Sequence, residues 1–228
     1  MFKRFTILAI LFLSFLPTFA AAGEVIDRIV ATVNGHIILQ SDWEDALRFE
    51  SFTAGRSLRE LTSADRKAAL DRLIDQELLR EQMKASDFPH ATEDEVTARV
   101  SDIRKQYPNA TSEPGWQQLL SQYRLSEEEL KKRVGDELDL LRLVDARLRP
   151  TVQIDPKVIE SYYSQELLPQ LRHSGAKEVS LAEVSPKIKE LLIQKRVNEL
   201  LTAWLETLRA GSDIHDDSAA SGSGGQAR

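Results

Sequence analysis

The sequence has no cysteine among its 228 residues. Disulfide bridges, thiolate metal ligands and thiol nucleophiles are therefore excluded, and no cysteine can carry a lipid. The glycine-rich phosphate loops G-x-G-x-x-G and G-x-x-x-x-G-K-[ST] and the serine elbow G-x-S-x-G are also missing. The hydrophobic core must hold the fold together. We predict that the chain is not an enzyme, has no catalytic residues and binds no cofactor.

Histidine is scarce, and no two histidines have the spacing of a metal-binding pair. The acidic runs 127–129 and 216–217 lack the alternating Asp/Asn pattern of a calcium loop, and helix capping and a solvated tail explain them better. We therefore predict no metal site and interpret the histidines as solvated residues of turns and loops: His36, His90, His173 and His215.

The N-terminus has the three parts of a secretory signal peptide. Lys3 and Arg4 precede an apolar run over residues 5–16, and small residues end at Ala22. The run is shorter than the ~20 residues that cross a bilayer, which disfavours a membrane anchor. We expect cleavage after Ala22, export, and no stable membrane insertion of the mature chain.

The chain is acidic, with a formal net charge of −6. Loss of Lys3 and Arg4 with the signal peptide leaves 28 basic and 36 acidic residues, a net charge of −8. Nucleic acid and anionic lipid are disfavoured as partners by that sign.

One β-hairpin is predicted directly after the signal peptide. β-Branched residues over 25–33 and 36–39 flank Asn34-Gly35, a pair that tolerates the positive φ angles of a two-residue turn. An isolated hairpin is marginally stable, so another element must cover it or extend it.

The rest of the chain shows the 3.6-residue period of helices, with capping boxes at Thr92 to Glu95 and at Ser126 to Glu129. Residues 169–177 are predicted to form a loop, and Ser185-Pro186 to begin the last helix, which Gly211 ends. Residues 218–228 are rich in Ser and Gly and predict a flexible tail. The fold class is mainly α with a small β addition. Helices are predicted over 41–54, 63–86, 92–107, 113–123, 126–149, 155–167 and 185–210.

Three segments resemble SurA-type periplasmic chaperones. Residues 25–42, VIDRIVATVNGHIILQSD, are similar to that family's opening strand, turn, strand and helix start. Residues 69–79, ALDRLIDQELL, resemble its next helical block, and residues 188–214 resemble its closing helix and strand. The first segment is the most specific of the three.

The resemblance implies one chaperone domain over 23–217, in which the N-terminal hairpin packs with the last helix and a strand near Ile214. Relatives often carry a parvulin prolyl-isomerase domain where this chain has only the residues between Glu166 and Glu178. A domain needs ~50 residues or more, so we predict that the isomerase is absent. Because the paired ends are distant in sequence, two copies could exchange them and form a homodimer.

The function that the resemblance implies is ATP-independent binding of unfolded exported polypeptides in the periplasm, with outer-membrane protein precursors as clients. The alternatives are an envelope assembly factor with one dedicated partner and, least favoured, a prolyl isomerase. A holdase needs accessible apolar side chains, although large apolar residues usually fill the core. The candidates for peptide contact are Phe49, Phe52, Trp116 and Tyr123.

Overall fold

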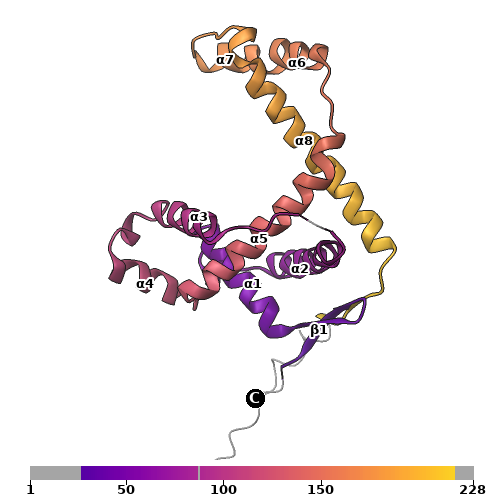
Figure 1. Cartoon of the computed structure of the whole chain (residues 1–228). Coiled ribbons are helices and arrows are strands. Elements are labelled where there is room, and N and C mark those ends of the chain that lie inside the picture. The colour runs from indigo at the N-terminus through magenta and orange to yellow at the C-terminus, as the bar shows by residue number, and fades with distance from the viewer. Residues whose placement is uncertain (1–26, 87, 219–228) are drawn as a thin grey trace, which may run out of the picture.

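The computed structural model describes residues 27–86 and 88–218 and is largely helical (Figure 1). The mainly α fold class with a small antiparallel sheet is confirmed. The predicted signal peptide, residues 1–22, lies outside the described residues, and so does the predicted tail except for Ser218.

The predicted hairpin is formed by β1 (Ile29–Val33) and β2 (His36–Leu39), which pair antiparallel. Both turn residues have positive φ, 50° at Asn34 and 82° at Gly35. A third strand, β3 (Ile214–Asp216), pairs antiparallel with β1, so the strand order is β2-β1-β3. The predicted meeting of the hairpin and the C-terminal strand is confirmed, and it gives the sheet the third strand that a stable hairpin needs.

Capping boxes begin three helices, at Thr92 and Ser126 as predicted and also at Thr62, directly before the predicted helix start at Ser63. The hydroxyls of Thr62, Thr92 and Ser126 each accept a hydrogen bond from the backbone N–H three residues later. In each case the acidic residue at that position bonds back to the cap, which completes a capping box. The helices of the main body are α1 (Gln40–Thr53), α2 (Ser63–Lys84), α3 (Glu93–Lys105), α4 (Glu113–Gln122) and α5 (Glu127–Leu148).

Two apolar clusters make up most of the core. The first joins the end of α1 to α3, α4 and α5 around Phe52 and Trp116. The second packs the inner face of the sheet, including Val33 and Ile38, on Leu70 and Ile74 of α2. A smaller cluster joins α2 and α5 to α8 (Leu181–Ala210), which runs back to the sheet.

The N-terminal half of α8 extends away from this body with α6 (Pro156–Tyr162) and α7 (Leu168–Ser174), as Figure 1 shows. A π-helical segment, Tyr163–Leu167, joins α6 to α7. The Tyr163 hydroxyl donates to the carbonyl of Val179, 2.7 Å away, and fixes the connection that leads to α8. At the base of this arm, the Arg149 guanidinium contacts the Glu190 carboxylate at 2.5 and 2.6 Å.

Two predicted helix boundaries are wrong, and both were placed at a proline that does not interrupt the helix. The predicted loop at 169–177 is helical as far as Ser174, because Pro169 lies where the π-helical segment Tyr163–Leu167 passes into α7 and does not end the helical backbone there. The last helix begins at Leu181, not at Ser185-Pro186, and contains Pro186 in its interior. Packing of α8 against α6, with Ile159 and Ile188 buried, offsets the bond that Pro186 cannot make.

Candidate functional site

A cleft of about 540 Å³ lies between α1, α2 and α5, with β2 at one end. Its lining includes the buried apolar side chains of Ile38, Ala46 and Leu125. Phe49, Leu73 and Leu140 also line it and are only partly buried. The cleft therefore combines a few partly exposed apolar side chains with a lining that is mostly polar or charged.

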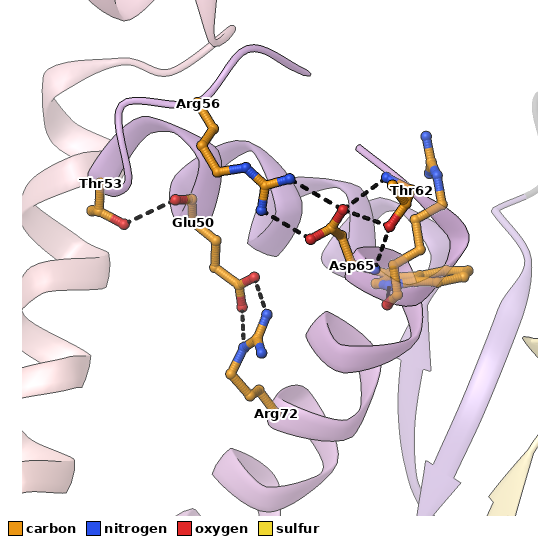
Figure 2. Close-up of polar contacts among 8 residues, drawn as sticks. Glu50, Thr53, Arg56, Thr62, Asp65 and Arg72 are labelled. Carbon is orange, nitrogen blue, oxygen red and sulfur yellow. Dashed lines mark hydrogen bonds and ion pairs between the residues drawn. The ribbon is translucent and has the colours of Figure 1, made fainter. Parts of the chain in front are cut away.

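An ion pair between α1 and α2 lies in the lining of the cleft and is shown in Figure 2. The Arg72 guanidinium forms two hydrogen bonds to the Glu50 carboxylate, one of them with Nε 2.7 Å from Oε1. This pairing raises the pKa of Arg72. A two-point contact of this kind fixes the orientation of both groups and joins α1 to α2 beside the cleft.

A second ion pair in Figure 2 joins the loop after α1 to the start of α2. Arg56 donates to both oxygens of Asp65, at 2.9 and 3.2 Å. The backbone N–H and the hydroxyl of Thr62 donate to the same carboxylate at 2.8 and 2.7 Å. The Arg56 bond is the largest cause of a strong lowering of the Asp65 pKa, followed by the Thr62 bonds. Asp65 thus takes part in the cap of α2 and also binds the loop before it through Arg56.

Glu77 is a buried carboxylate in the lining of the cleft, with only 2% of its surface exposed. Its Oε2 pairs with Arg80 Nη1, and His36 Nε2 lies 3.6 Å from the same oxygen. Its Oε1 is buried and has no hydrogen-bond partner among the described residues. An unpaired buried acceptor costs about 1–3 kcal/mol, so this wall of the cleft is not optimised for stability alone.

Arg133 contributes a second desolvated charge to the cleft. Burial lowers the pKa of its guanidinium. The group lies 5.9 Å from the centre of the Phe49 ring and 3.5 Å from an Asp45 carboxylate oxygen. These contacts hold the ring of Phe49 at the edge of the cleft.

The four predicted contact residues come together around one aromatic cluster but differ in accessibility. Phe52 and Trp116 are buried, with exposed fractions of 0% and 1%, and their ring centres lie 6.0 Å apart. Tyr123 packs edge-on against Phe52 at 5.5 Å and is partly buried. Phe49 is also partly buried and is the member of the set that lines the cleft. Phe52 and Trp116 are therefore core residues of the first apolar cluster and do not line the cleft.

A second hollow, of about 730 Å³, adjoins the cleft at the turn between α4 and α5. Tyr123 lines this hollow, and Arg124 lines both the hollow and the cleft. We call it the arginine hollow, because four arginines contribute to its lining: Arg48, Arg59, Arg66 and Arg124.

Two features of the site, Glu77 and the arginine hollow, were not predicted from the sequence. Glu77 had a detectable signal, since it lies three residues after Ile74 and seven after Leu70, on the apolar stripe of α2. The arginine hollow had none, because its side chains come from α1, α2 and two separate turns that only the tertiary fold brings together.

Within residues 27–86 and 88–218, no cluster of His, Asp and Glu could hold a metal ion. In that same part of the chain, no helix is long and apolar enough to span a bilayer.

Comparison with known proteins gives one finding that concerns the whole cleft. The family model described as the SurA-like N-terminal domain matches residues 3–144, more than half of the chain. No curated protein matches the chain. The matched region includes every residue that lines the cleft and the arginine hollow and ends inside α5. The chain belongs to the SurA-like N-terminal domain family, a family of periplasmic, chaperone-type domains.

Proposed function

We propose that this protein is an ATP-independent holdase of the periplasm that binds unfolded polypeptides in the cleft. One observation supports this most directly: partly exposed apolar side chains, Phe49, Leu73 and Leu140, line a cleft among charged residues, in a chain of a chaperone-type family. Such a surface can bury apolar side chains of many sequences without selecting one. Precursors of outer-membrane proteins are the clients that the family resemblance suggests.

Among the four aromatic candidates, we assign direct contact to Phe49 and Tyr123 and a positioning role to Phe52 and Trp116. Phe49 lines the cleft, and Tyr123 lines the arginine hollow. Phe52 contacts the rings of both Trp116 and Tyr123, so it sets where these rings lie.

The same proposal includes export and removal of residues 1–22, which gives a mature chain that starts at Gly23 and acts as one chaperone module to residue 217. Mass spectrometry of the protein recovered from the periplasm tests this, and an uncleaved N-terminus would overturn it. Prolyl isomerisation is not part of the proposal, because the residues between Glu166 and Glu178 form α7 and a short connection.

The test of function is light scattering from two unrelated unfolded proteins, one of them an outer-membrane protein, with and without the mature chain. A holdase suppresses aggregation of both. Suppression of neither would contradict the proposal and favour a dedicated assembly factor.

A matched pair of variants locates the activity. Phe49→Ala should weaken suppression, because its ring lines the cleft. Leu119→Ala is the control, since Leu119 packs on the same apolar cluster, is also partly buried and lines neither the cleft nor the arginine hollow. Equal loss of suppression in both variants would show that stability, not the cleft, limits activity.

A further inference from the structure

The arginine hollow has a charge opposite to that of the whole chain. Its lining includes four arginines and one acidic residue, Glu44, whereas the protein has a net charge of −6. The cleft beside it is lined by more acidic than basic side chains. Gathered charges of one sign repel each other, and an anion in their midst relieves that repulsion.

Three of these arginines have unused guanidinium groups. Arg48 pairs with Glu44 and Asp45. Arg59, Arg66 and Arg124 are exposed and form no ion pair with any residue in the described part of the chain. Most other arginines of α1, α2 and α5 are paired, for example Arg72 and Arg142. The hollow thus offers several planar donors of the kind that bind carboxylates at two points.

The backbone at Arg124 is a second, independent observation. Arg124 has a φ of 53° and directly follows the end of α4. Its N–H bonds to the carbonyl of Ser121, and that of Leu125 bonds to the carbonyl of Leu120, at 3.0 and 3.1 Å. This is a Schellman ending, in which glycine is usual at the left-handed position because other residues are strained there. An arginine at this position therefore lowers the stability of the fold. Its side chain lines both the cleft and the arginine hollow.

We propose that the arginine hollow binds a carboxylate of the polypeptide held in the cleft, so that the protein prefers clients with an acidic residue beside an apolar stretch. The apolar stretch lies in the cleft, and the acidic side chain reaches Arg124 and the arginines beyond it. Leu58, Leu61 and Tyr123 supply apolar contacts around the anion. This inference rests on the proposed function, because it requires that the cleft hold a polypeptide.

The test compares two short unstructured peptides that differ only in two positions next to an apolar stretch, glutamate in one and glutamine in the other. The glutamate peptide should bind the mature chain about tenfold more tightly, and added salt should reduce that preference. Arg124→Gly should remove most of the preference while leaving the melting temperature unchanged or higher, because glycine relieves the left-handed strain.

Arg99→Gln is the matched control, since Arg99 is an exposed arginine of α3 that lines neither the cleft nor the arginine hollow. It should leave the preference intact. Equal affinity for the two peptides, or the same preference in Arg124→Gly as in the wild type, would overturn the inference and leave the proposed function standing. Failure to bind either peptide would contradict both.

Discussion

Arg209 on α8 and Asp75 on α2 form a hydrogen-bonded ion pair, with Nε 2.6 Å from Oδ1. Nη2 of the same arginine donates to the carbonyl of Asp71 at 2.8 Å. These contacts join segments 134 and 138 residues apart and hold α8 on the helix that forms one wall of the cleft. The C-terminal helix is therefore anchored to α2, one of the helices that line the cleft.

Arg209→Gln should lower the free energy of unfolding by about 1–3 kcal/mol, because it removes charge-assisted hydrogen bonds in a partly buried site. Urea denaturation measures this change. Arg196→Gln, also on α8, breaks a surface pair with Glu199 and should change stability by less than about 0.5 kcal/mol. Equal effects in the two variants would show that Arg209 does not link α8 to α2.

Gly115 is required by a close approach of two backbone segments. A Cβ at this position would lie 2.3 Å from the carbonyl oxygen of Asn109. Gly115→Ala should therefore destabilise the fold by about 1–3 kcal/mol. Gly135→Ala on α5 should instead stabilise it by about 0.5–1 kcal/mol, because the added Cβ would meet Val96 at an ordinary 3.6 Å. Thermal melting of the pair checks the opposite signs, and a stabilised Gly115→Ala would contradict this packing.

Alanine at Phe52 should reduce stability and not only client binding. The ring is fully buried and contacts Tyr107, Trp116 and Tyr123. Removal of such a ring costs about 3–5 kcal/mol. The denaturation midpoint of Phe52→Ala should fall well below that of Phe49→Ala, whose side chain is only partly buried. Similar midpoints would mean that Phe52 is more accessible than the structure shows.

Asp65 should make stability depend on pH in the acid range. Its pKa is lowered, first by the bond from Arg56 and then by the bonds from Thr62. Such a group stabilises the fold above its unfolded pKa of about 3.9, and this contribution is lost as the pH falls toward the folded value. Asp65→Asn should therefore melt below the wild type at neutral pH, and the gap should narrow as the pH falls below about 4.

The control for this pH dependence is Asp94→Asn, which removes an acidic residue from the first turn of α3. Asp94 is exposed and is not the residue that closes the capping box there. Its effect on melting should be smaller than that of Asp65→Asn. A gap between the wild type and Asp65→Asn that stays constant down to acid pH would contradict the assigned role of Asp65.

Local signals in the sequence predicted most of the fold. Asn34-Gly35 located the hairpin, and the boxes at Thr92 and Ser126 located α3 and α5, because each signal acts within a few residues. The signal at Ser185-Pro186 predicted the wrong start for α8, since packing of α8 on α6 outweighs a local preference. Tertiary packing decided this boundary, as it also decided which aromatic side chains are buried.

The candidate site was predicted only in part. The four aromatic candidates were chosen because they lie on or beside short elements flanked by loops, and their packing into one cluster was not predicted. Which of its members are accessible was not predictable, since burial depends on how α1, α4 and α5 pack. Arg124 could not be found at all, because no sequence rule expects a left-handed arginine at the end of a helix.

Site-specific photo-crosslinking to an unfolded polypeptide tests the central claim most directly. In the test variant a photoreactive residue replaces Gln76, which is exposed and lines the cleft. In the control it replaces Gln118, which is exposed on α4 and lines neither the cleft nor the arginine hollow. We predict strong crosslinks from position 76 and few from position 118, both reduced by unlabelled client in excess. Equal crosslinking from both positions, or none from position 76 while aggregation is still suppressed, would contradict the assignment of the cleft as the binding site.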